Sequence, residues 1–123
     1  MENFLSIGLG GAIGAISRYC LGNIITKIYG SSFPYGTFCI NITGCFLMGL
    51  LMTIIVDKGM LSPGWRLFLC VGVLGGFTTF SSFSYETLTL LQEGNLLYSI
   101  LYAGGSVVLG VLAAFMGVML ADI

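Results

Sequence analysis

The sequence has no histidine, few charged residues and only two prolines. Charged side chains make up 7% of the 123 residues, against roughly 25% in an ordinary soluble domain. The missing histidine excludes imidazole catalysis and His-ligated metal sites. Four basic and five acidic side chains leave no basic surface for nucleic acid. These absences argue against an enzyme, a soluble globular domain and a nucleic-acid-binding protein.

Hydrophobic residues and glycine dominate instead. Hydrophobic residues reach 57%, and the 19 glycines are roughly twice the usual share. Glycine in an apolar chain is typical of membrane helices that pack closely. Small residues recur at four-residue spacing in three pairs, which are Gly10 and Gly14, Gly72 and Gly76, and Ser106 and Gly110. The composition predicts a small, closely packed membrane protein, and the surplus of glycine indicates an oligomer.

Charges and turn residues divide the chain into four apolar segments. Each is long enough for the roughly 20 helical residues that cross a bilayer. The predicted fold class is therefore an all-α membrane protein, with a single four-helix transmembrane domain over 1–123. Helices are expected at about 3–29, 35–56, 63–92 and 95–121. The connections are so short that successive helices should run antiparallel.

Lysine and arginine give a weak signal for orientation. Lys27 lies at one face of the predicted bundle, and Lys58 and Arg66 lie at the other. Arg18 is too near the middle of its segment to contribute. So small a bias permits insertion in both orientations, and with it a dimer of two antiparallel subunits.

A few polar side chains interrupt the apolar segments near mid-membrane. A charge at the depth of Arg18 needs a partner or a wet cavity, so it is either functional or a structural contact to an acid or to carbonyls. Asn41 shares a helix face with Thr37, and it either makes an interhelical hydrogen bond or faces a solute. Tyr102 and Ser106 lie one turn apart in the last segment. They are either packing contacts or hydrogen-bond donors along a pore.

The third segment contains an unusual stretch at residues 75–84. Paired glycines stand there beside five hydroxyl residues. Glycine loosens a helix, and Ser and Thr compete for its backbone hydrogen bonds, so we predict that the helix is broken near its middle. The alternative is a continuous helix whose hydroxyls bond to its own carbonyls. Broken helices at bilayer depth commonly bind ions through carbonyls and helix ends, as in transporters.

Three sequence motifs occur in order along the chain. They are GGAIGAISRY at 10–19, GT at 36–37 followed by NITGCFLMG at 41–49, and GGFTTFSSFSYE at 75–86. Together they resemble the Fluc (CrcB) family of fluoride channels, and the resemblance covers essentially the whole chain. One departure is Gly110, where the family can carry a further hydroxyl.

The resemblance implies a dual-topology antiparallel homodimer in the bacterial inner (plasma) membrane, with two pores through which fluoride leaves passively. It implies a structural sodium ion at the dimer centre, held by the backbone carbonyls of Gly75 and Thr78. The implied pore residues are Asn41, Phe80, Phe83, Tyr102 and Ser106. Arg18 would add positive potential at a vestibule, and Glu86 would be a hydrogen-bond acceptor beside a gate. Donors and positive aromatic ring edges suit fluoride, which is small and strongly hydrated.

Two functions from other classes compete with this interpretation. A proton-coupled small multidrug-type exporter also has four helices, but it needs a membrane-embedded carboxylate. The sequence has no acid between Glu2 and Asp57, and Glu86 sits near the end of its helix. A structural or assembly subunit would explain the glycines but not the hydroxyl-rich third segment.

Overall fold

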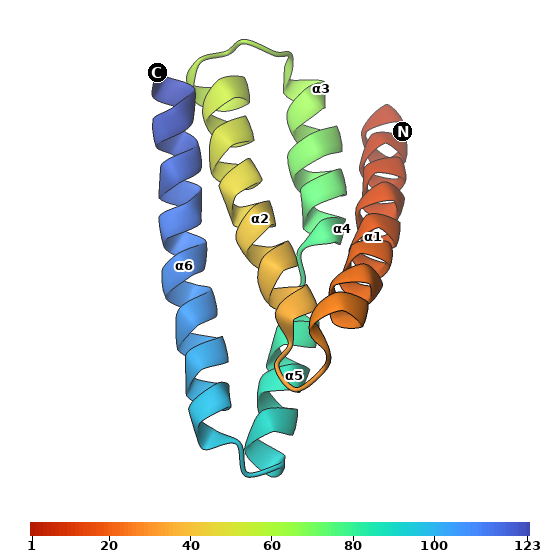
Figure 1. Ribbon diagram of the computed structural model, residues 1–123. Coiled ribbons are helices and arrows are strands. Elements are labelled where there is room, and N and C mark those ends of the chain that lie inside the picture. Colours follow the sequence, from red (N-terminus) through yellow and green to blue (C-terminus); the bar gives the residue numbers. More distant parts are fainter.

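The computed structural model describes all residues, 1–123, as an antiparallel helical bundle (Figure 1). Four helices are long and apolar enough to cross a membrane, namely Glu2–Tyr29, Tyr35–Asp57, Pro63–Gln92 and Leu96–Asp122. These confirm an all-α protein with four membrane-spanning helices. The expected bounds of 3–29, 35–56, 63–92 and 95–121 differ from them by no more than one residue at any end. Both termini lie at the same end of the bundle (Figure 1).

Two of the spans consist of more than one element. The first span of the chain is a single helix, α1 (Glu2–Tyr29). The second span is α2 (Tyr35–Met52), continued by the π-helical segment η1 (Thr53–Asp57). The third contains α3 (Pro63–Trp65), the π-helical segment η2 (Arg66–Leu74), α4 (Gly75–Phe77) and α5 (Phe80–Gln92). The last is the single helix α6 (Leu96–Asp122).

Local sequence explains where the spans begin and end. Gly30 follows α1 with a φ of 86°, and Gly94 follows α5 with a φ of 80°. Residues with a side chain rarely adopt this conformation, so glycine suits both turns. Pro63 begins α3, where a missing N–H leaves no helical hydrogen bond unmade.

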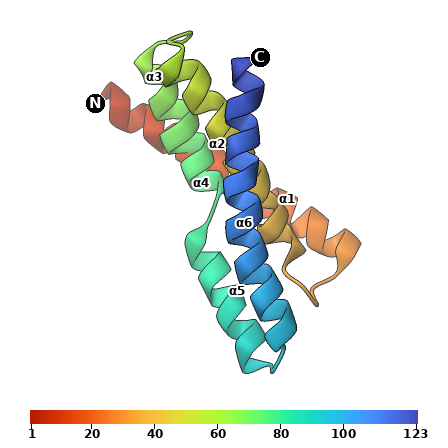
Figure 2. The same cartoon turned by 90° about the vertical axis from the view of Figure 1, so that its left-hand side faces the viewer.

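Glycine lets α1 cross the third span at close range, and Figure 2 shows α1 running obliquely to the other helices. A Cβ atom built on Gly10 would lie 3.0 Å from the Cα of Gly72, and one on Gly76 would lie 3.1 Å from the Cα of Gly11. A Cβ on Gly14 would overlap the carbonyl oxygen of Val73. The predicted glycine pairs of these two spans are therefore helix contacts within one subunit.

A second close contact joins α2 to α6. A Cβ atom on Gly49 would overlap the carbonyl oxygen of Ala114, and one on Gly117 would overlap that of Phe46. At the end of α6 the Lys58 ammonium donates to the carbonyl of Ala121, where the helix dipole also favours a cation. Large apolar side chains cover much of the outer surface, as lipid contact requires.

We predict that Gly49→Ala destabilises the protein because its methyl group would force α2 and α6 apart. The expected loss is about 1 to 3 kcal/mol, as for other overpacked contacts. Gly8→Ala is the matched control, since no atom lies within 4 Å of a Cβ at Gly8. It should leave stability unchanged or raise it by up to about 1 kcal/mol. The measurement is the fraction that stays folded after heating in detergent, and equal behaviour of the two variants would contradict the prediction.

Candidate functional site

Thr78 and Thr79 separate α4 from α5. Both have extended backbones, with φ −83° and ψ 155° at Thr78 and φ −148° and ψ 123° at Thr79. Figure 2 shows this connection as a thin extended segment between the two helices. The amide of Thr78 still donates to the carbonyl of Leu74 at 3.0 Å, but the extended backbone beyond it leaves the helical pattern. The backbone groups around them therefore need other partners at membrane depth.

Asn41 of α2 supplies partners for Thr79. Its Nδ2 donates to the carbonyl oxygen of Thr79 at 3.0 Å, and its Oδ1 accepts from the Thr79 amide at 2.9 Å. The Thr79 hydroxyl in turn accepts from the amide of Ser82 at 3.2 Å and caps α5. Asn41 thus makes the interhelical hydrogen bond that its position allows. The second hydrogen of Nδ2 has no partner within the chain.

Arg18 of α1 binds the other side of the interruption. Its Nε donates to the carbonyl oxygen of Gly76 at 3.1 Å, and its side chain is half-buried. In a continuous α-helix that carbonyl would accept from the amide of Phe80. A carbonyl contact is one of the partners that a charge at this depth requires.

The carbonyl oxygens of Gly75 and Thr78 lose their α-helical donors. In an α-helix each amide donates to the carbonyl four residues earlier. The amide of Thr79, which would reach Gly75, donates instead to the Oδ1 of Asn41. The amide of Ser82, which would reach Thr78, donates to the hydroxyl of Thr79. Both carbonyls thus lack their helical partners, and carbonyls released by a broken helix are groups that can hold a cation.

Four of the five predicted pore residues line one pocket of about 310 Å³. Its walls are Asn41, Gly44, Cys45, Met48, Thr78, Thr79, Phe80, Phe83, Ser106 and Val107. Cys45 and Met48 line this pocket too, although the sequence motifs did not predict them as site residues. Their positions four and seven residues after Asn41 place them on the same face of α2, and that spacing could have identified them.

This pocket, called the pore pocket after the predicted residues that line it, combines aromatic rings with a free hydroxyl. The ring centroids of Phe80 and Phe83 lie 5.8 Å apart, with the planes tilted by 44°. Phe80 is 79% exposed on the single chain, whereas Phe83 is half-buried. The Oγ of Ser106 is buried and has no hydrogen-bond partner in the chain. Because buried hydroxyls are nearly always bonded, Ser106 needs an acceptor that the chain does not supply.

Tyr102 is fully buried and lies beside the pore pocket instead of lining it. Its ring centroid is 5.1 Å from that of Phe83. Its hydroxyl donates to Oε1 of Glu86 at 3.0 Å, and the Thr37 hydroxyl donates to Oε2 at 3.1 Å. Glu86 thus accepts hydrogen bonds from both α2 and α6.

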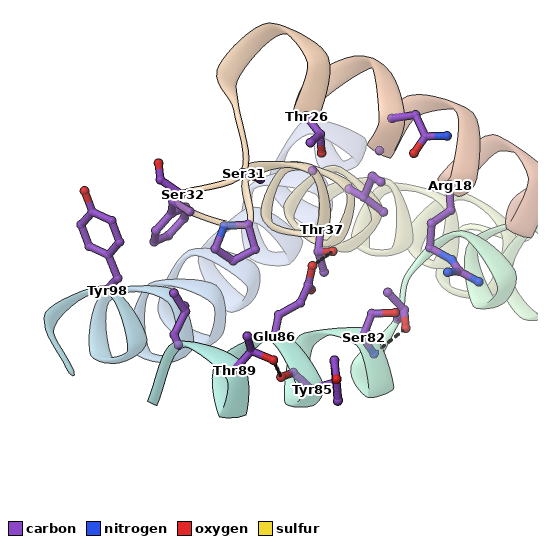
Figure 3. Close-up of a pocket in the computed structure, with 18 of the residues that line it drawn as sticks. Arg18, Thr26, Ser31, Ser32, Thr37, Ser82, Tyr85, Glu86, Thr89 and Tyr98 are labelled. Atoms are coloured by element: carbon purple, nitrogen blue, oxygen red, sulfur yellow. Dashed lines mark hydrogen bonds between the residues drawn. The ribbon is translucent and has the colours of Figure 1, made fainter. Parts of the chain in front are cut away.

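A larger pocket of about 590 Å³ lies next to the first and is bounded by α1, the loop after it, α5 and the first turns of α2 and α6. Its labelled residues, drawn in Figure 3, are Arg18, Thr26, Ser31, Ser32, Thr37, Ser82, Tyr85, Glu86, Thr89 and Tyr98. Arg18 and Glu86, the two predicted vestibule or gate residues, both belong to its wall. Thr79 lines both pockets, so the two spaces meet at the interruption.

Comparison with known proteins gives consistent results. The family described as "CrcB-like protein, Camphor Resistance (CrcB)" matches residues 5–118. A protein of Acidobacterium capsulatum named "Fluoride-specific ion channel FluC" is 47% identical over 119 residues, which cover 97% of this chain and 95% of that protein. A protein of Thermus thermophilus with the same name is 51% identical over 117 residues, covering 95% and 93%. A third, from Chloroflexus aurantiacus, is 51% identical over 118 residues, covering 96% and 94%.

We predict that Asn41→Ala loosens the connection between α4 and α5. The substitution leaves the amide and the carbonyl of Thr79 without their partner, and we expect a loss of stability of about 2 kcal/mol. The direct measurement is hydrogen exchange at the Thr79 amide, which should become markedly faster. Thr53→Val is the control, because the Thr53 hydroxyl bonds only to the Gly49 carbonyl of its own turn. Unchanged protection of the Thr79 amide in Asn41→Ala would contradict the role of Asn41 as the partner of Thr79.

Proposed function

The chain belongs to the CrcB-like protein family, and from this membership we propose that it is a fluoride-specific ion channel. It is a multi-pass bacterial membrane protein and not an enzyme. The weak acid HF crosses membranes and dissociates in a near-neutral cytoplasm, which traps fluoride there. A passive channel lets the ion leave and so lowers its toxicity.

The structural observation that supports this proposal is the composition of the pore pocket. Fluoride is strongly hydrated, so a pore must replace its water with hydrogen-bond donors. The unpartnered Ser106 hydroxyl and the free hydrogen of Asn41 Nδ2 supply such donors. Phe80 and Phe83 can add positive ring edges, which give larger and softer anions no strong donor. In this proposal Tyr102 borders the path and donates to Glu86.

We propose further that two chains assemble as an antiparallel homodimer with dual topology. Phe80 borders the pore pocket and yet is 79% exposed on one chain, so a second chain would complete the wall. The small bias in lysine and arginine permits the two orientations.

A structural sodium ion at the dimer centre fits the same arrangement. The carbonyls of Gly75 and Thr78 have lost their α-helical donors, and carbonyl oxygens replace the water of a monovalent cation. Two carbonyls from one chain do not enclose a cation by themselves. A second, oppositely oriented chain would bring another pair and complete the coordination.

The exporter alternative would assign proton coupling to Glu86. Both carboxylate oxygens of Glu86 already accept a hydrogen bond, one from Tyr102 and one from Thr37. Glu86 lines the larger pocket and not the pore pocket, and both of its carboxylate oxygens are engaged by these two hydroxyls. The geometry therefore favours the channel.

We predict that the purified chain in liposomes releases fluoride rapidly when an ionophore dissipates the membrane potential. Chloride should be retained, and a cationic dye should not accumulate under a proton gradient. A fluoride electrode, a chloride electrode and dye fluorescence measure the three quantities. Dye uptake driven by protons would support the exporter, and no flux of any solute would support a structural subunit.

We predict that Phe80→Ile and Phe83→Ile each reduce fluoride efflux steeply. Isoleucine keeps bulk and hydrophobicity but loses the positive ring edge, and the packing cost of about 1 kcal/mol should leave the protein folded. Phe→Met at the same sites should retain part of the flux, because methionine is polarizable and adapts its shape. Phe77→Ile, outside the pore pocket, is the control and should conduct. Normal efflux in both pore variants would defeat the aromatic mechanism.

We predict that replacing sodium with a larger monovalent cation weakens either fluoride flux or the dimer. A larger ion does not fit ligands that a rigid interface holds at sodium distance. Efflux and elution on a sizing column are measured in parallel. Insensitivity of both to the cation would count against the site at Gly75 and Thr78.

A further inference from the structure

One aromatic residue outside the pore pocket has more ring contacts than any other. Phe33 lies in the loop between α1 and α2, where its centroid is 5.0 Å from Tyr35 and 6.1 Å from Phe38. It is also 5.7 Å from Tyr98 and 5.5 Å from Tyr102. A loop residue with four aromatic neighbours is held in place, and it can hold its neighbours in place in return.

Tyr102 is the neighbour that connects Phe33 to the pore. The Tyr102 ring contacts both Phe33, which meets it nearly edge to face at 82°, and Phe83, which is tilted by 55°. Phe33 lines the larger pocket, Phe83 lines the pore pocket, and Tyr102 lines neither. A fully buried ring thus contacts one aromatic residue from the wall of each pocket.

We infer that Phe33 is a positioning residue for the pore and that it acts through Tyr102. This inference rests on the proposed fluoride channel. The Phe33 ring closes the space into which Tyr102 would otherwise rotate, and so keeps the Tyr102 hydroxyl on Glu86. That hydrogen bond fixes the tyrosine ring against Phe83, one of the two aromatic residues of the pore pocket.

The test compares fluoride efflux of wild type, Phe33→Leu and Phe33→Tyr in liposomes. Leucine keeps apolar bulk but removes all four ring contacts, each worth a factor of about two to ten in an equilibrium, so we expect efflux to slow by about tenfold. Tyrosine restores the ring and should restore the flux. Phe68→Leu is the matched control, because it removes the Trp65 ring contact outside both pockets and should leave the flux unchanged.

A double-variant comparison distinguishes positioning from a general loss of structure. Tyr102→Phe removes the hydroxyl, so Phe33→Leu should slow efflux much less in that background than in wild type. An equal slowing factor in both backgrounds, or unchanged efflux in Phe33→Leu, would overturn the inference. If Phe33→Leu does not elute as a folded protein, Phe33→Met provides the same comparison with the same decisive outcomes. Absence of fluoride flux in wild type would instead refute the proposed function.

Discussion

The structure depends on one constraint, which is that every backbone polar group inside a bilayer needs a partner. The extended residues Thr78 and Thr79 violate the helical pattern, and the rest of the site compensates for them. Asn41 bonds both backbone groups of Thr79, and Arg18 bonds the carbonyl of Gly76. These two polar side chains are expensive in lipid, but their hydrogen bonds to the backbone make the interruption possible.

That interruption also organises the two pockets. Thr79 lines both of them, so the hydroxyl-rich larger pocket and the phenylalanine-lined pocket adjoin where α4 ends and α5 begins. The polarity changes there from hydroxyls to ring edges with a few donors. In the proposed channel, such a path would hold fluoride weakly enough to release it and would exclude anions that need stronger donors. A passive channel requires no more than this.

Glycine determines how closely the helices around this path approach one another. Contacts of Gly14 with Val73, and of Gly49 with Ala114, bring backbones together that lipid alone would not drive into contact. Close packing of the backbones therefore holds these helices together, and polar side chains act at the site. The aromatic group around Phe33 then closes the bundle where the α1–α2 loop meets α6.

The sequence by itself determined the four spans, because hydropathy and turn residues are local properties. It also determined which glycines of α1 pack against another helix and that residues 75–84 disturb the third helix. Small residues and hydroxyls act on the backbone that carries them. Helical spacing placed Asn41 and Ser106 on particular faces, but it could not name their partners. Only the tertiary structure showed that Asn41 bonds Thr79, that Tyr102 donates to Glu86 and that Ser106 is left without an acceptor. The reason is that a hydrogen bond across the bundle depends on the distance and angle between helices far apart in sequence, which periodicity along one helix does not encode.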